Sequence, residues 1–201
     1  MPGDMINRRV QFNMQMFHAH RDERPKEEKW ELIDGTPTMM PPPTLMHQRI
    51  CANLDRLLNA RLEATKPDWR ADREVGLLLP KDDKFNPEPD VTIIDAKIGA
   101  EQIYAERFYF VCEVLSRNDK KWVLDGKVIY YRAHELNNGI LFVRQDSVVA
   151  ILHSRAAGGQ SDGQWHERRL VDAGGPLDLP AIGVIGRLGD LYRHTPLDPW
   201  G

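Results

Sequence analysis

The 201-residue sequence has little cysteine, no strong excess of either charge and no long hydrophobic run. Its two cysteines, Cys51 and Cys112, lie far apart and have no metal-ligand spacing, which argues against a disulfide-rich secreted scaffold. No stretch approaches the roughly 20 apolar residues of a membrane span. The polar N-terminus, residues 1–9, has no signal-peptide apolar segment. We therefore expect a cytoplasmic protein.

The overall charge does not by itself indicate a nucleic-acid partner. The net charge is -3 and the sequence pI is about 6.2, whereas a strongly basic chain would point to nucleic acid directly. A local basic cluster beside a bound cation can still outweigh a mildly acidic whole. Hydrophobic residues make up 41% of the chain, enough for a substantial core. We expect an N-terminal extension at 1–29 that is partly helical or disordered, one domain at 30–195 and a tail at 196–201.

Turn and capping signals set the first elements of that domain. Asp34-Gly35 lies between two short apolar runs and predicts a β-hairpin, because the turn favours positive φ at both central positions. Thr44 is suited to cap a helix, and apolar residues then repeat at helical spacing until Pro67, which predicts an amphipathic helix of about five turns. The further predicted elements are strands at 75–79, 91–94, 108–115, 140–143 and 148–152, a helix at 123–134, a loop at 158–163, a last strand at 165–171 and a terminal helix at 188–192.

This order of elements predicts an α/β (α+β) fold. The core is a mixed central β-sheet flanked by helices, with an N-terminal β-hairpin and extra C-terminal strands. The run 108–115 is the most apolar segment and is typical of a central strand covered on both faces. The aromatic strand at 165–171 could form an edge at which two copies pair as a homodimer.

Glu113 is the chemical anomaly of the sequence, because seven of the eight residues in the run 108–115 are apolar or aromatic. Burying an ionised carboxylate costs several kcal/mol unless a cation pairs with it. The partner would be a lysine, an arginine or a divalent cation. Alternatively, Glu113 lies near the strand end and reaches solvent.

Asp90 and Lys127 are the other two candidates. Asp90 opens the strand before that of Glu113, and two carboxylates on adjacent strands can share a hard cation such as Mg²⁺. Asp90 could instead only cap a turn. Lys127 lies on the helix that follows Glu113, from which it could reach back to the carboxylates or point into solvent as most helix lysines do.

The order of five motifs resembles that of one known family. They are Trp-Glu-Leu-Ile-Asp-Gly at 30–35, Met-Met-Pro-Pro-Pro at 39–43, His47 on the following helix, Pro-Asp-Val at 89–91 and Glu-Val-Leu-Ser at 113–116. The combination is similar to that of a widespread bacterial family of restriction-endonuclease-like proteins in the PD-(D/E)xK nuclease superfamily. The match runs from about Trp30 to Tyr192. It implies a restriction-endonuclease-like core, Mg²⁺ or Mn²⁺ as cofactor, and hydrolysis of phosphodiester bonds in nucleic acid, with DNA as the expected substrate.

Within this resemblance, Asp90 and Glu113 correspond to the metal-binding carboxylates. The superfamily often has lysine two residues after that glutamate, but Leu115 occupies this position here. The family resembled carries its lysine on the next helix, where Lys127 lies. Glu31 matches a recurring acidic position in the first strand and is either a partner of the site or a surface charge. His47 matches a recurring histidine, a position that is more often structural than ligating.

The segment after Ser116 departs from the family pattern. Its positive residues Arg117, Lys120 and Lys121 would suit contact with a phosphate backbone. Together with Leu115, this departure keeps an alternative open. The chain could be a catalytically inactive nuclease-fold module for binding or assembly, because a fold alone does not guarantee chemistry.

Overall fold

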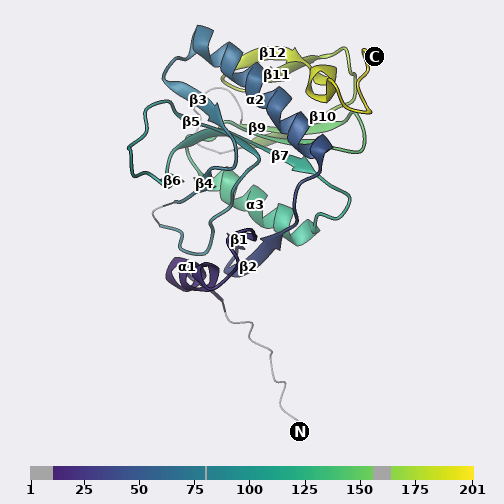
Figure 1. Cartoon of the computed structure of the whole chain (residues 1–201). Coiled ribbons are helices and arrows are strands. Elements are labelled where there is room, and N and C mark those ends of the chain that lie inside the picture. The colour runs from purple at the N-terminus through teal and green to yellow at the C-terminus, as the bar shows by residue number, and fades with distance from the viewer. Residues whose placement is uncertain (1–10, 80, 156–163) are drawn as a thin grey trace.

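The computed structural model describes residues 11–79, 81–155 and 164–201, and Figure 1 shows the whole chain. The loop predicted at 158–163 lies outside these ranges. So do residues 1–10 of the N-terminal extension predicted at 1–29.

The predicted hairpin is confirmed. Strands β1 (Lys29–Ile33) and β2 (Thr36–Met40) pair antiparallel. Asp34 and Gly35 have φ values of 47° and 67°, as the two central positions of a type I′ turn require. Before the hairpin, helix α1 (Met14–Asp22) is capped by the Asn13 side chain and buries Phe17 completely.

A six-stranded mixed sheet forms the centre of the molecule. Its strand order is β10-β9-β8-β7-β5-β3, in which only the β7–β8 pair is parallel. Strand β7 (Phe108–Leu115) is central and covered on both faces, as its apolar run predicted. The other strands are β3 (Trp69–Asp72), β5 (Val91–Asp95), β8 (Gly139–Arg144), β9 (Ala150–Arg155) and the edge strand β10 (Trp165–Leu170).

Four short strands form two small two-stranded sheets. Strand β4 (Gly76–Leu77) pairs with β6 (Tyr104–Ala105), so the strand predicted at 75–79 is mostly loop. Strands β11 (Pro176–Leu179) and β12 (Gly183–Arg187) form a second hairpin, so the expectation that 165–171 is the last strand was wrong. A short 3₁₀ helix, η1 (Leu188–Tyr192), follows where a terminal helix was predicted.

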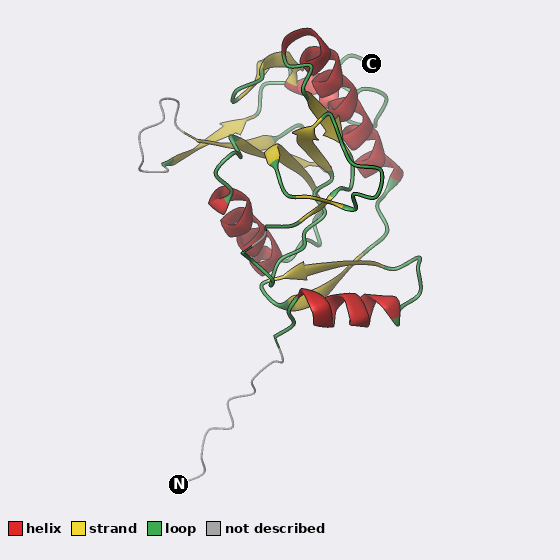
Figure 2. Ribbon diagram, turned by 90° about the vertical axis from the view of Figure 1, so that its left-hand side faces the viewer, coloured by secondary structure: helices red, strands yellow, loops and turns green. Residues whose placement is uncertain are grey.

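Two long helices cover opposite faces of the central sheet (Figures 1 and 2). Helix α2 (Leu45–Thr65) begins at the predicted cap Thr44 and packs with β11, β12 and η1 on one face. Helix α3 (Lys121–Ala133) connects β7 to β8 on the other face, and the β1–β2 hairpin and α1 lie beyond it. No helix among the described residues is long and apolar enough to cross a membrane. The architecture confirms the predicted mixed α+β fold.

Candidate active site

Asp90 and Glu113 face each other across two neighbouring strands. Strands β5 and β7 are antiparallel, with Val91 opposite Cys112. One step further along this register brings Asp90 opposite Glu113, and directly opposed residues share a face of the sheet. A second link joins the two strands here, because the backbone N–H of Val114 donates a hydrogen bond of 2.6 Å to Oδ2 of Asp90. The structure thus brings together the two carboxylates that the sequence singled out.

Helix α2 contributes His47 to Asp90. The imidazole Nε2 lies 3.2 Å from Asp90 Oδ2, and both side chains are about 15% exposed. A carboxylate only accepts hydrogen bonds, so this nitrogen carries the proton. Burial alone would raise the pKa of Asp90, but the hydrogen bond and charge of His47, with the Val114 N–H, lower it below its usual value. Burial alone would lower the pKa of His47, but the hydrogen bond and the negative charge of Asp90 raise it above its usual value.

Glu113 is buried and paired, so the alternative that it reaches solvent is excluded. Only 6% of the residue is exposed. Lys127 Nζ lies 3.1 and 3.2 Å from its two carboxylate oxygens, and the Tyr131 hydroxyl donates a hydrogen bond of 2.5 Å to Oε1. Burial raises the pKa of Glu113 to about 7, and the negative charges of Asp90 and Glu31 act in the same direction. Lys127 lowers this pKa but does not offset them.

Lys127 lies between two carboxylates rather than in solvent. Its Nζ is 2.8 Å from Oε2 of Glu31 as well as 3.1 Å from Glu113, and the residue is 2% exposed. Burial by itself would lower the pKa of Lys127, but Glu113 and Glu31 raise it well above its ordinary value. The ammonium group therefore stays protonated at neutral pH.

Glu31 links the hairpin to the segment that leads to Asp90. Its Oε1 accepts the backbone N–H of Glu88 at 3.0 Å, two residues before Asp90. The residue is 1% exposed, so it is not a surface charge. Gly126 allows α3 to approach this hairpin, since a Cβ there would lie 2.9 Å from Ile33 Cγ2. A glycine directly before Lys127 thus lets the lysine reach Glu31.

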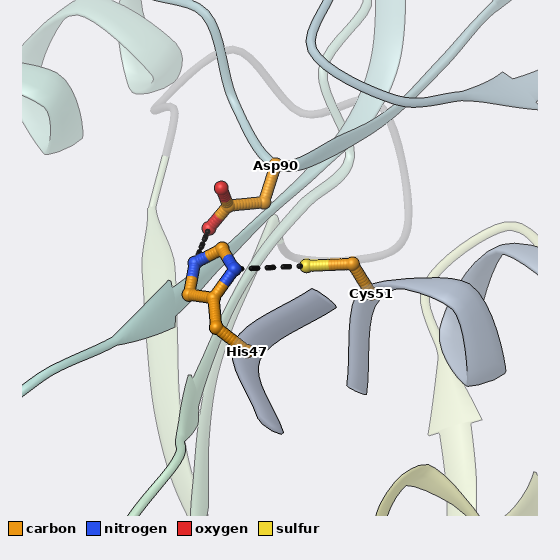
Figure 3. Close-up of side chains that lie close together, drawn as sticks. All are labelled: His47, Cys51 and Asp90. Carbon is orange, nitrogen blue, oxygen red and sulfur yellow. Dashed lines mark hydrogen bonds and ion pairs between the residues drawn. The ribbon is translucent and has the colours of Figure 1, made fainter. Parts of the chain in front are cut away.

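His47 has a second neighbour on its own helix. Cys51, one turn later, lies with Sγ 3.6 Å from the other imidazole nitrogen, Nδ1 (Figure 3). His47, Cys51 and Asp90 each offer one potential ligand atom within 4.8 Å of the others. Burial raises the pKa of the Cys51 thiol, so the thiol is neutral at ordinary pH.

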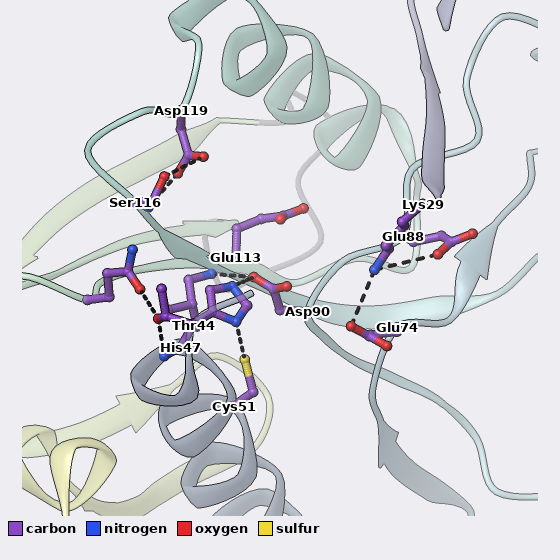
Figure 4. A network of polar contacts seen from close by, with 12 residues as sticks. Lys29, Thr44, His47, Cys51, Glu74, Glu88, Asp90, Glu113, Ser116 and Asp119 are labelled. Atoms are coloured by element: carbon purple, nitrogen blue, oxygen red, sulfur yellow. Dashed lines mark hydrogen bonds and ion pairs between the residues drawn. The ribbon is translucent and has the colours of Figure 1, made fainter. Parts of the chain in front are cut away.

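The loop after β7 is closed by its own hydrogen bonds. Asp119 accepts from the backbone N–H of Ser116 at 2.6 Å and from its hydroxyl at 3.0 Å (Figure 4). The positive side chains here are exposed, and two of them pair outside the carboxylate cluster. Arg117 binds Asp146 and Lys121 binds Asp125. None of the ion pairs between described residues joins Arg117, Lys120 or Lys121 to Asp90 or Glu113.

Sequence reasoning missed three parts of this cluster. Tyr131 was not among the predicted site residues, although it follows Lys127 by four residues and therefore lies on the same helix face. The contact of Cys51 with His47 was not predicted, although the i, i+4 spacing of the two residues was visible in the sequence. The contact of Glu31 with the Glu88 backbone had no signal in the sequence, because it depends on the loop path between β4 and β5.

The mixed sheet, the flanking helices and the acidic pair at one end of β5 and β7 define a restriction-endonuclease-like fold. The chain belongs to the Uma2 family, described as "Putative restriction endonuclease", whose model matches residues 14–184. The solved structure of "a putative nuclease belonging to DUF820" from Anabaena variabilis has a TM-score of 0.69 with this chain at 14% identity. The alignment covers 90% of this chain and 97% of the other. No curated protein matches the chain. The family supports a nuclease, and the solved structure shows the same fold.

Proposed function

We propose that this protein is a metal-dependent nuclease that hydrolyses phosphodiester bonds of nucleic acid, with DNA as its substrate. One observation carries the proposal. Asp90 and Glu113 oppose each other at the end of β5 and β7, and the buried Lys127 lies beside Glu113. The membership of the chain in a family named for restriction endonucleases supports DNA as the substrate.

The donor groups fit a hard divalent cation. Mg²⁺ and Mn²⁺ prefer carboxylate and carbonyl oxygens. Oδ2 of Asp90 is engaged by Val114 and His47, whereas no described residue donates a hydrogen bond to Oδ1. Both oxygens of Glu113 contact Lys127, but this lysine has a second carboxylate partner in Glu31 at 2.8 Å. Glu113 can therefore turn toward a cation while Glu31 still balances the positive charge of Lys127.

Each residue of the set has a distinct task. Asp90 and Glu113, with the backbone carbonyl that follows Glu113, would hold Mg²⁺ or Mn²⁺. The ion would supply charge neutralisation at the phosphate and acidify a water molecule. Lys127 is protonated, so it steadies negative charge and does not act as a general base. Glu31 and Tyr131 fix the positions of Lys127 and Glu113, and His47 fixes Asp90.

The exposed cations at the start of α3 are proposed as the contact to the nucleic-acid backbone. The side chains of Lys121 and Arg117 are 87% and 79% exposed. Lys120 lies between them at the N-cap position of α3. Cationic side chains beside a helix N-terminus attract phosphate without reading sequence.

The test combines metal binding with cleavage. Mg²⁺ and Mn²⁺ are titrated calorimetrically into metal-free wild type, Asp90→Asn and Glu113→Gln, with and without a short DNA duplex. Both variants should lose binding and cleavage while retaining their circular dichroism spectrum. Asp95→Asn is the matched control. It removes the carboxylate at the other end of β5, which contacts Tyr109 and Arg107. Cleavage that persists in both active-site variants would contradict the proposal.

A second candidate function is favoured by the fact that both carboxylate oxygens of Glu113 already have hydrogen-bond partners. Lys127 contacts both of its oxygens and Tyr131 contacts Oε1, which would suit a nuclease-fold module that binds nucleic acid or a protein without cutting. This module would bind DNA equally well in wild type and Asp90→Asn. It would bind no Mg²⁺, even with DNA present.

A further inference from the structure

Cys51 on α2 has no task in the proposed hydrolysis, and His47 contacts Asp90 there only through Nε2, which leaves Nδ1 beside the Cys51 thiol. The two residues are four positions apart on one helix, so their side chains lie on the same face. Cys51 is 3% exposed, and His47 connects it to the more accessible Asp90. Figure 3 shows the imidazole between the thiol and the carboxylate, with one ring nitrogen directed to each.

The distances match those of a transition-metal site. Nδ1 of His47 and Sγ of Cys51 are 3.6 Å apart. Nitrogen and sulfur ligands bound at about 2.1 and 2.3 Å to one tetrahedral ion lie roughly 3.5 Å from each other. The other ring nitrogen, Nε2, lies 3.2 Å from Asp90 Oδ2. A carboxylate in this position is the usual partner of a metal-bound histidine, because it fixes the ring and increases the basicity of the ligating nitrogen.

We propose that His47 and Cys51 form a site for a borderline or soft divalent cation, with Zn²⁺ as the best fit, and that Asp90 orients His47 for it. Water or another ligand would complete the coordination. Thiolate and imidazole select Zn²⁺ over Mg²⁺, which takes oxygen ligands. This site is therefore distinct in chemistry from the one proposed between Asp90 and Glu113.

Binding requires the Cys51 thiol to lose its proton. The Zn–S bond forms as the S–H bond breaks, and the proton leaves to the solvent buffer. No electron transfer is involved. The binding itself does not depend on the proposed nuclease activity. One consequence does rest on that function. A dication beside His47 would repel a second one at Asp90, so Zn²⁺ should oppose Mg²⁺.

The test uses the full chain and Co²⁺ as a spectroscopic substitute for Zn²⁺. Co²⁺ bound to a thiolate gives a near-ultraviolet charge-transfer band, which Zn²⁺ should abolish by displacement. The chain offers a matched control, since Cys112 is its other cysteine and is also buried and free. Wild type and Cys112→Ala should show the band, and Cys51→Ala should not. Calorimetry should give one Zn²⁺ per chain, with at least about tenfold weaker binding in Cys51→Ala and in His47→Gln.

Two further measurements make the outcome decisive. Circular dichroism of each variant verifies that the fold is kept. Titration in two buffers of different ionisation enthalpy, at a pH at which His47 is neutral, should reveal about one proton released per Zn²⁺ bound. The proposal is overturned if folded wild type gives no thiolate band. It is also overturned if the band survives in Cys51→Ala, since the thiolate would then come from another residue.

Discussion

The two helices that cover the sheet each bring a cationic or titratable side chain to one of the two opposed carboxylates, but they do so in different surroundings. Helix α2 brings His47 to Asp90, and both side chains remain about 15% exposed. Helix α3 brings Lys127 to Glu113, where the lysine side chain is 2% and the glutamate side chain 8% exposed. Figure 4 shows Asp90 with His47 and Glu113 near one another at this end of the sheet.

The site therefore has two halves: a buried, fixed half on the α3 side and a more exposed, adjustable half on the α2 side. On the α3 side, Glu31 and Tyr131 complete a buried network in which each charge depends on its neighbours. Removing one partner leaves an uncompensated buried charge, which is costly. On the α2 side, contact with solvent reduces the cost of any change, and the protonation of His47 can vary near neutral pH. His47 on α2 and its partner Asp90 are therefore the part of the site that pH or a bound cation can alter.

Removing Lys127 should have the largest effect on stability. In Lys127→Met, Glu31 and Glu113 lose their shared cation while both remain buried. We expect the free energy of unfolding to fall by about 3–5 kcal/mol, measured by urea denaturation. The control is Lys121→Met on the same helix, whose side chain is 87% exposed and should tolerate the change. Equal stability of the two variants would mean that the two buried carboxylates do not depend on Lys127.

Removing the Tyr131 hydroxyl should have a smaller effect on the same network. In Tyr131→Phe, Glu113 loses the hydrogen bond of 2.5 Å but keeps Lys127. A hydrogen bond to a charged group contributes about 1.5–3 kcal/mol, and we expect a loss in that range. Lys127→Met with Tyr131→Phe completes a double-mutant cycle. Strict additivity in this cycle would contradict a shared role at Glu113.

The α2 half should give a pH-dependent difference. Asp90 raises the pKa of His47 in the folded protein, although burial opposes it. The resulting stabilisation is fully present below the ordinary histidine pKa of about 6.5 and is lost as pH rises through the raised value. Subtracting the curve of His47→Gln from that of wild type, from about pH 5 to about pH 9 in metal-free buffer, isolates this contribution. A flat difference curve would show that His47 gains nothing from Asp90.

Local signals predicted much of the fold correctly. Asp34-Gly35 set the hairpin and Thr44 the start of α2, because turn and cap preferences act within a few residues. The apolar run of β7 predicted its central position. Strand β3 was missed because its four residues, Trp69–Asp72, include two charged ones and are held by pairing with β5. Strands this short depend on tertiary pairing more than on sequence pattern.

The sequence singled out Asp90, Glu113 and Lys127, which the structure brings together, but not the contacts that connect them. The carboxylate in an apolar run identified Glu113, and the structure shows that it is buried with a cation. The sequence could not tell that Lys127 would be shared with Glu31, because the two are 96 positions apart and meet only when α3 packs on the hairpin. For the same reason, the contact of His47 with Asp90 depends on how α2 crosses the end of β5.

The smallest expected effect concerns the exposed cations outside both halves. Lys121 forms an i, i+4 pair with Asp125 and touches neither carboxylate of the site. If its charge meets the phosphate backbone, Lys121→Ala should weaken DNA binding alike for all sequences and reduce the slope of log K against log salt by about 1. Stability and metal binding should stay unchanged, because the side chain is in solvent. Fluorescence anisotropy of a labelled duplex at several salt concentrations measures the slope. An unchanged slope would move the DNA-binding surface away from the start of α3.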